Sequence, residues 1–411
     1  MLRFACSPTG DMHIDKLRVA LLNYIASKQK EEDFIVRIDD MDNKKNIEGK
    51  DQEILGLLEL FGIKYSQVVY QSQNFRFHSA MALDLLHKKK AFACFCSPEW
   101  LENKKNEAKA AHKPYKYDDA CRNLPAELVI DNTAPFTVRI ARPDKQIGSD
   151  ADAVESFIIM HQDKTPTYNF ASAVDDMLSN ISMIIREEKY KGDTAKEVHV
   201  RNALGYEKNI EYIYLPSISD APSVTWLLTE GYLPEAILNY LISITNESSK
   251  EVFTLEEAVE WFDFDKISKS PVQFDINMLK HINKEHLKNL DAKELSRYVG
   301  FADEEIGELA RIYLEEADTT KELKTKVAPI FSQRVIPEKF AQQTALMAQT
   351  IQNAPYFEKY NDFKNYVMKE TDLQGEDFFK PLQILLTNTE QGPDVSEVYK
   401  YLKNYIKEII K

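Results

Sequence analysis

The first sixty residues place a strand, a turn and a helix in an order that few folds accommodate. Residues 2–6 form a short apolar run, residues 7–11 (SPTGD) have the composition of a turn, and apolar side chains recur at helical spacing after His13. A second apolar run at 34–38 and a helical pattern at 46–61 follow. This order predicts an α/β domain built on a parallel sheet.

Polar residues gather where these strands are predicted to end. The turn at 7–13 follows the first strand, and Asp39, Asp40 and Asp42 follow the second. Ligands of open parallel sheets bind beyond the carboxyl ends of the strands. We therefore expect the functional site of this domain at that edge of the sheet.

The rest of the chain changes character after Tyr206. Strand patterns precede this residue and helical patterns follow it, with no internal repeat. The sequence thus predicts an α/β part followed by an all-α part. The predicted strands are 138–140, 157–159 and 183–186, and the clearest helical stretches are 234–244, 255–262 and most of 290–411.

Composition excludes several classes of protein. A chain of 411 residues with 44% hydrophobic and 29% charged residues is neither disordered nor fibrous, and no apolar run approaches the ~20 residues of a membrane helix. The N-terminus lacks the apolar core of a signal peptide, and four cysteines in a large chain are typical of the reducing cytosol. We expect a cytoplasmic monomer without a membrane partner. The net charge of −14 argues against non-specific polyanion binding, although nucleic acid binding depends on where the basic residues lie.

Five segments, in collinear order along the whole chain, resemble motifs of the glutamyl-tRNA synthetases. These are class I enzymes that join glutamate to tRNA through a glutamyl-adenylate. In the last segment Gln383 stands where the family has an arginine. The segments are RFACSPTGDMHI at 3–14, VRIDDMD at 36–42, TPTYNFASAVDD at 165–176, EGYLPEAILNYL at 230–241 and GEDFFKPL at 375–382.

The resemblance implies a fold and a domain order. It predicts a Rossmann-like parallel-sheet catalytic domain at 1–215, with an acceptor-binding insertion at about 75–150. An all-α stem-contact domain at 216–290 and an all-α anticodon-binding-like domain at 291–411 are expected to follow. The family's cofactors are ATP and magnesium, and its partners are glutamate and a tRNA of the Glu or Gln type.

The motifs that bind ATP in the family are degraded here. His13, the residue expected to be catalytic, is kept, but Asp15 replaces the glycine of the HIGH-type turn. Its carboxylate would lie close to a triphosphate; alternatively, Asp15 simply caps a helix that begins near Lys16. The interval 215–229, where the family has its lysine-rich KMSKS-type loop, holds no lysine or arginine. The family's RGEDH-SNT motif reads REEKYKGDT at 186–194, and 139–156 looks shorter than its family counterpart.

The glutamate pocket is better preserved. By resemblance Arg3 pairs with the substrate side-chain carboxylate, because a planar guanidinium suits bidentate recognition. Without the resemblance, Arg3 and Asp39 would be interpreted as satisfied ion pairs near the sheet edge. The other residues that the resemblance places in this pocket are Ser7, Asp39, Tyr168, Ser172 and Arg186.

A cysteine cluster lies within the predicted insertion. Cys94 and Cys96 are followed by Tyr117 and, four positions later, by Cys121. Some relatives of the family bind zinc through a Cys-x-Cys…Tyr-x3-Cys pattern, which would give a closed, structural, tetrahedral site. The alternative is a group of reduced cysteines packed as small hydrophobes. Cys6, where the family has proline, is expected to be a core residue.

A second segment resembles the catalytic lysine loop but lies in the wrong place. Residues 266–270 read KISKS, yet they follow the 230–241 motif and precede PVQFD, as does a stem-contact segment of the family. We therefore predict that Lys266 and Lys269 contact tRNA and not ATP. Lysine-rich stretches at 88–90, 104–105 and 113–116 are either solvated helix faces or contacts to the tRNA acceptor end.

Three functions remain open from the sequence. The first is a catalytically impaired paralogue that retains tRNA binding and also has the residues of a glutamate pocket. The second is an active glutamate–tRNA ligase with divergent signature loops. The third is a protein-interaction or regulatory module that no longer binds tRNA. The missing lysine loop favours the first over the second, and the retained helical half favours it over the third.

Overall fold

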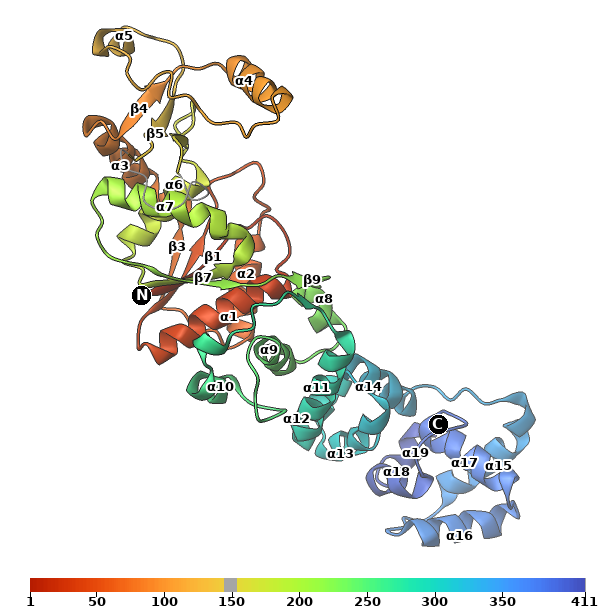
Figure 1. Ribbon diagram of the computed structural model, residues 1–411. Coiled ribbons are helices and arrows are strands. Elements are labelled where there is room, and N and C mark those ends of the chain that lie inside the picture. Colours follow the sequence, from red (N-terminus) through yellow and green to blue (C-terminus); the bar gives the residue numbers. More distant parts are fainter. Residues whose placement is uncertain (144–153, 411) are drawn as a thin grey trace. The chain divides into compact units, whose positions relative to one another are not determined.

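The computed structural model describes residues 1–143 and 154–410, so part of the 139–156 stretch lies outside the described residues. The chain forms two compact units (Figure 1). The first contains Met1–Ala221 and Glu256–Gln273, and the second contains Pro222–Leu255 and Phe274–Lys411. The finer three-domain division at residues 215 and 290 stays a prediction.

The first unit is built on a parallel sheet, as the sequence predicts, and this sheet has five strands. The central strand β1 pairs along its whole length with β2, and β7 lies on its other side. The carboxyl ends of these three strands meet at one edge. In sheet order the strands are β3 (Gln67–Tyr70), β2 (Phe34–Ile38), β1 (Leu2–Cys6), β7 (Met183–Glu187) and β8 (Glu211–Leu215).

Helix α1 (Ile14–Gln29) connects β1 to β2 and packs against β1 and β7. His13 precedes its first turn with an extended backbone, and the Asp15 carboxylate accepts the Lys16 backbone N–H at 2.8 Å. The alternative that Asp15 caps a helix starting near Lys16 is therefore wrong in position, since Asp15 lies inside the first turn. Helix α2 (Lys50–Leu60) starts four residues later than predicted, because Gly49 precedes it in the left-handed region at φ +78°.

An antiparallel three-stranded sheet, in the order β4-β5-β6, forms the insertion. Apolar side chains from this sheet share a core with helices α3, α6 and α7, which join the insertion to the main sheet. The elements are α3 (Phe75–His87), β4 (Ala91–Cys94), α4 (Pro98–Ala110), α5 (Ala126–Ile130), β5 (Thr137–Ile140), β6 (Phe157–Met160), α6 (Tyr168–Leu178) and α7 (Lys191–Leu204).

The second unit is helical, as predicted. A two-stranded parallel ribbon, β9 (Ile218–Ser219) with β10 (Val272–Gln273), belongs to the first unit, as does most of α10 (Leu255–Trp261). No helix among the described residues is long and apolar enough to cross a membrane. The helices of the second unit are α8 (Val224–Thr229), α9 (Pro234–Ser243), α11 (Ile276–Asn289), α12 (Ala292–Val299), α13 (Glu304–Ile312), α14 (Thr320–Val327), α15 (Ala341–Asn353), α16 (Tyr360–Thr371), α17 (Glu376–Thr387), α18 (Val395–Leu402) and α19 (Ile406–Ile409).

Candidate functional site

A cavity of about 340 Å³ opens at the carboxyl ends of β1 and β7, where the sequence places the site. Five of the six residues predicted for the glutamate pocket line it. Ser172 does not: it lies one turn along α6 from Tyr168, is buried, and accepts a hydrogen bond from Arg37 at 3.1 Å. The lining includes Arg3, Cys6, Ser7, Thr9, Lys16, Asp39, Tyr168, Arg186, Glu187 and Tyr190.

Arg3 and Asp39 are each held by an ion pair, though not with one another. Arg3 donates from Nε and Nη2 to Asp176 at 3.0 and 3.2 Å. Arg37 donates to Asp39 at 2.6 Å and also to Asp176 at 2.8 Å. Burial alone would raise the pKa of Asp176, but Arg3 and Arg37 outweigh burial and lower that pKa to about 2.

The sequence motifs contain Arg37 and Asp176 but do not indicate that these two residues form ion pairs under the cavity. The sequence does offer one signal for this pairing, which is a charged residue within an apolar segment. Arg37 lies inside a predicted apolar strand, and a buried charge in such a place needs a partner of opposite sign. Asp176 therefore joins both arginines beneath the floor of the cavity.

Arg186, on the other wall, is only partly engaged. Its Nη1 donates to buried Glu197 at 2.9 Å and its Nη2 to the Thr194 hydroxyl at 2.5 Å. Its Nε is buried and has no hydrogen-bond partner among the described residues. Burial raises the pKa of Glu197, although Arg186 opposes that rise. Because that Nε atom is itself buried, what Arg186 offers a ligand in the cavity is the positive charge of its guanidinium.

Cys6 lies at the end of β1 and is 5% exposed. Burial raises the pKa of its thiol to about 11, so the thiolate needed for a nucleophile is scarce at neutral pH. Its burial agrees with the prediction of a core residue, and its backbone position brings it to the cavity wall.

The turn at His13, which the resemblance assigns to ATP, makes contacts within the chain. The His13 Nδ1–H donates to the Ala221 backbone carbonyl at 2.7 Å. Ala221 lies in residues 216–223, the short connection between β8 and α8. Nearby, the buried Glu187 carboxylate pairs with Lys189 at 2.8 Å. Burial lowers the pKa of Lys189, but Glu187 and Asp15 outweigh it and raise that pKa.

The KISKS segment leads directly into β10, which pairs with β9 in that short connection. The register is parallel, with Val272 opposite Ile218. Only Val272 and Gln273 take part in this pairing. Lys266 is exposed and pairs with Asp263 at 3.0 Å, and Lys269 is also exposed.

The three cysteines and the tyrosine of the insertion come together around one point. The Sγ atoms of Cys94, Cys96 and Cys121 lie within 4.8 Å of one another, so they can hold a metal ion. The Tyr117 hydroxyl is 3.3 Å from the Sγ of both Cys94 and Cys96. Burial opposes the Cys94 thiolate, but hydrogen bonds from Tyr117, the Cys96 backbone and Arg139 outweigh it and lower the pKa of Cys94.

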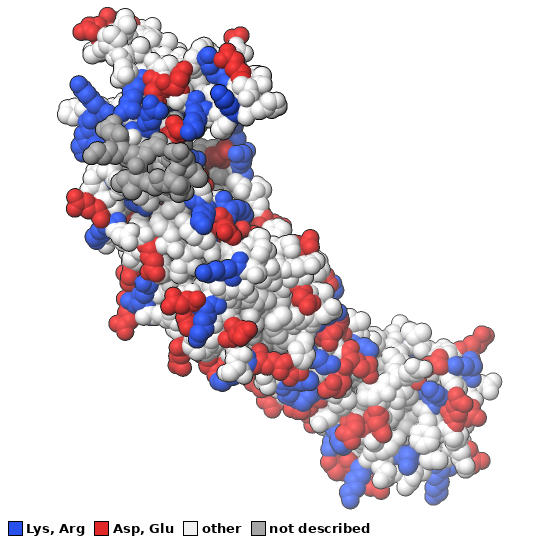
Figure 2. All heavy atoms as spheres, in the orientation of Figure 1, with Lys and Arg blue, Asp and Glu red and all other residues white. Residues whose placement is uncertain are grey.

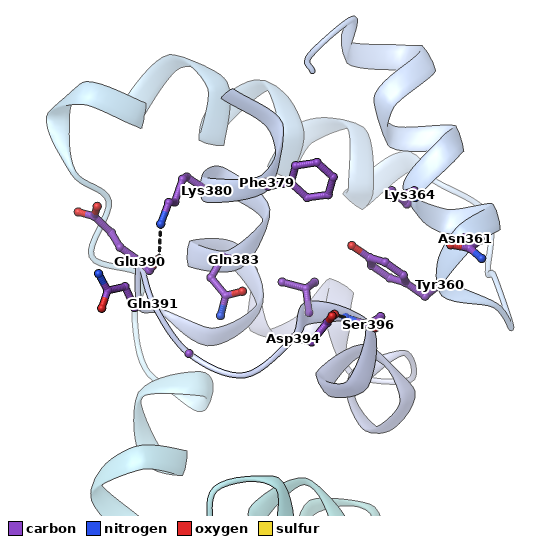
Figure 3. A pocket seen from close by; sticks show the side chains of 12 residues that line it. Tyr360, Asn361, Lys364, Phe379, Lys380, Gln383, Glu390, Gln391, Asp394 and Ser396 are labelled. Carbon is purple, nitrogen blue, oxygen red and sulfur yellow. Dashed lines mark hydrogen bonds between the residues drawn. The ribbon is translucent and has the colours of Figure 1, made fainter. Parts of the chain in front are cut away.

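A further cavity, of about 590 Å³, lies in the second unit between α16, α17 and the start of α18 (Figure 3). Phe379 and Tyr360 give it two aromatic side chains. Lys364, Lys380 and Gln383 add polar groups, and Lys380 donates to the Glu390 carbonyl at 3.1 Å. The segment 375–382 that resembles the anticodon domain thus contributes to its wall.

The parallel sheet, its insertion and the site at the strand ends define a class I aminoacyl-tRNA synthetase fold. Residues 1–281 match the family described as tRNA synthetases class I (E and Q), catalytic domain. A glutamate tRNA ligase from Elizabethkingia meningosepticum, crystallised with its amino acid, superposes with a TM-score of 0.80 over 99% of this chain and 97% of its own, at 22% identity.

Relatives with higher sequence identity indicate which family within this class the chain belongs to. Glutamate–tRNA ligase 2 of Sulfurimonas denitrificans is 60% identical over 100% of both chains. Glutamate–tRNA ligase 1 of Campylobacter jejuni (strain 81-176) is 44% identical over the same shares. The chain therefore belongs to the glutamyl-tRNA synthetase family, as the motifs predict.

Proposed function

We propose that this chain binds the tRNA and the amino acid of its family but does not form glutamyl-adenylate. The observation that carries the proposal is the connection at 216–223. This segment has no lysine or arginine. Its Ala221 carbonyl accepts the hydrogen bond of His13, the residue expected to contact phosphate. A phosphate-binding loop must supply donors and positive charge, and this connection supplies a carbonyl acceptor instead.

Asp15 and Glu187 stand where the family has glycines, and both carboxylates disfavour phosphate binding. Asp15 lies in the first turn of α1, where the positive end of the helix dipole would otherwise favour phosphate. Its carboxylate already accepts the Lys16 N–H of that turn. Glu187 adds a carboxylate on the cavity wall, which Asp39 also lines. Two like charges about 4 Å apart repel by about 1–4 kcal/mol at surface-like dielectrics, so a triphosphate is disfavoured here.

The relatives' lengths support loss of a segment. The Sulfurimonas and Campylobacter alignments each span 432 residues, whereas this chain has 411. The difference, 432 minus 411, means that 21 aligned positions have no counterpart in this chain. The 215–229 and 139–156 intervals are the places where the sequence looks shortened.

The KISKS segment does not replace the missing loop in this proposal. The residue of this region that reaches the connection beside Ala221 is Gln273, which donates to Asp220 at 3.5 Å. Exposed lysines without a buried scaffold are suited to phosphate contacts on a large polyanion. We assign Lys266 and Lys269 to tRNA for this reason.

Amino-acid binding is supported by what the cavity still offers. Arg3 and Arg186 place two guanidinium groups at its wall, and the Arg186 Nε–H is a buried donor without a partner. A planar guanidinium suits recognition of a carboxylate, so these two positive charges favour an anionic amino acid. Glutamate is the ligand that the family implies for this position.

The cysteine group fits zinc. The sulfurs of Cys96 and Cys121 are 3.6 Å apart, and two thiolates about 2.3 Å from a tetrahedral zinc lie about 3.8 Å from each other. Cys94, Cys96, Tyr117 and Cys121 would fill all four positions, so the metal would cross-link the insertion and take no part in chemistry. The cluster is packed against Trp100 and Leu101 of α4, which zinc would thereby fix.

Transfer RNA binding rests on the distribution of basic residues. On the face shown in Figure 2, lysine and arginine side chains are dense over the insertion. Lys88, Lys104 and Lys105 pair with acids of their own helices. Lys109 and Lys113 are exposed and have no carboxylate within 4.0 Å among the described residues, so they are available to phosphate. In the second unit, the cavity beside Phe379 is suited to a stacked base. We further propose a cytoplasmic monomer.

The second candidate is an active glutamate–tRNA ligase with divergent loops, which the 60% identity to a curated ligase favours. Glutamate-dependent exchange of pyrophosphate into ATP, measured with tRNA present, separates the two. Loss of one preorganised stabiliser typically costs 10²–10³ in rate, and several are missing, so we expect no exchange above background. Turnover close to that of the Sulfurimonas enzyme would refute the proposal. A protein that neither exchanges pyrophosphate nor binds tRNA would instead support the interaction-module function.

A further inference from the structure

Arg139 on strand β5 lies against the cysteine cluster although no motif singles it out. The residue is 7% exposed, and its Nε donates to the Cys94 Sγ at 3.3 Å. Its guanidinium carbon lies 3.9 Å from the centroid of the Tyr117 ring. Arg139 therefore touches two of the four proposed zinc ligands.

The strand register explains how it reaches them. In the antiparallel β4–β5 pair, Arg139 is directly opposite Phe92. Directly opposed side chains share a face of the sheet, and Cys94 lies two residues beyond Phe92 on that same face. The diagonal distance is within reach of a long side chain, so the fold itself aims the guanidinium at Cys94.

The charge of Arg139 has no carboxylate partner in the part of the chain that the structure describes. Among the described residues, no aspartate or glutamate oxygen lies within 4.0 Å of its guanidinium nitrogens. A buried charge without a counter-charge is strongly unfavourable. The groups that surround Arg139 are a thiol and an aromatic ring, so a stable arrangement requires the cluster to carry negative charge.

A loaded zinc site carries that charge. Three thiolates around a divalent ion leave a net charge of −1 with a neutral tyrosine ligand and −2 with a phenolate. We propose that Arg139 is the counter-charge of this site and a positioning residue for it, holding the Cys94 thiolate and the Tyr117 ring in ligating position and slowing release of the metal. This inference rests on the zinc site proposed above.

A neighbouring arginine supplies a matched control. Arg142, three residues further along, pairs with Asp119 at 3.2 Å, and Arg122 pairs with the same carboxylate at 3.5 Å. Arg142 is thus a nearby positive charge that, unlike Arg139, pairs with a carboxylate. Arg142→Met removes a charge from the same region without removing a donor to sulfur.

The experiment measures zinc release from the full-length protein into excess chelator, for wild type, Arg139→Met, Arg139→Lys and Arg142→Met. Loss of a hydrogen-bond partner of a metal ligand typically costs 10–100-fold in metal affinity. We expect Arg139→Met to release zinc 10–100-fold faster, Arg139→Lys to fall between it and wild type, and Arg142→Met to match wild type.

Cobalt substitution gives a readout that general destabilisation would not move. A donor to sulfur lowers the energy of its lone pairs, so removing Arg139 should shift the sulfur-to-cobalt charge-transfer band to longer wavelength. Arg139→Lys, which keeps the charge, provides the same test if Arg139→Met does not fold. A loaded wild type whose Arg139 variants keep its release rate and band position would overturn this inference alone. A wild type that binds neither zinc nor cobalt would overturn the proposed zinc site together with it.

Discussion

Replacing Asp176 by asparagine tests whether the cavity floor is held by charge or only by shape. The carboxylate accepts three charged hydrogen bonds, two from Arg3 and one from Arg37, and its side chain is fully buried. Asparagine has nearly the same shape but no charge. Asp176→Asn therefore leaves the buried Arg3 guanidinium without its carboxylate partner, whereas Arg37 keeps Asp39.

The magnitude follows from the pKa of Asp176. That pKa falls from its ordinary value of 3.8 to about 2 in the folded protein, and each unit corresponds to about 1.4 kcal/mol, which gives about 2–3 kcal/mol at neutral pH. Removing one partner of a buried ion pair costs about 3–5 kcal/mol, because the remaining charges are also left uncompensated. A depressed pKa stabilises above the unfolded value, and this contribution is lost as the pH falls from about 4 to about 2.

The assay is urea unfolding followed by tryptophan fluorescence in a Trp226→Phe background. The two remaining tryptophans, Trp100 and Trp261, both belong to the first unit, so the signal reports that unit. We expect Asp176→Asn to lower its free energy of unfolding by about 3–5 kcal/mol at pH 7, and the difference from wild type to shrink by about 2 kcal/mol at pH 2. The exposed Asp131→Asn control should stay within about 0.5 kcal/mol. A loss that is the same at both pH values would refute the electrostatic reasoning.

Three shorter predictions follow from the same structure. Protein purified without added metal should contain about one zinc per chain by elemental analysis. Cys94→Ser should lose this zinc and Cys6→Ser should keep it. If the metal-free protein is equally stable, the cysteines are packed as small hydrophobic residues and do not form a structural zinc site. Changing Lys266 and Lys269 to alanine should weaken tRNA binding in gel-shift titrations. The slope of log K against log salt concentration should become less steep by about one to two, since each phosphate contact contributes about one. Normal tRNA binding with lost ATP binding would mean that KISKS is the catalytic loop. Arg186→Met should weaken glutamate binding by calorimetry at least tenfold, whereas unchanged affinity would exclude Arg186 from the pocket.

Local patterns were sufficient to predict much of the fold. The strands at 2–6 and 34–38 have the bounds expected from their apolar runs, because a parallel strand buried on both faces is a continuous hydrophobic segment. The start of α2 was mispredicted because Gly49, one residue before it, has a left-handed backbone that the apolar pattern does not report. The pairing of β9 with β10, between segments more than 50 residues apart, has no local signal at all.

The site was predictable where motifs named its residues and unpredictable where long-range pairing decides. Resemblance was enough to gather Arg3, Tyr168 and Arg186 around one cavity. It did not show that Arg37 and Asp176 lie beneath them, since that contact joins residues 139 positions apart. Arg139 was missed for the same reason: its role depends on a cross-strand register and not on a motif.

The part of the site proposed for the amino acid and the part assigned by resemblance to the nucleotide differ in how strongly folding constrains their residues. Arg3, Arg37 and Asp176 are buried and mutually paired, so losing any one of them would destabilise the sheet whether or not glutamate binds. His13 is exposed, and the connection at 216–223 lies beyond the end of the sheet, so changes there cost little stability. A family member that no longer needed ATP would lose the nucleotide half first and keep the ion pairs under the amino-acid half. Retention of Arg3 is therefore weak evidence for glutamate binding. The same holds for Arg186, because its pair with the buried Glu197 carboxylate gives folding its own reason to keep that guanidinium, so only a binding measurement can assign either arginine to glutamate.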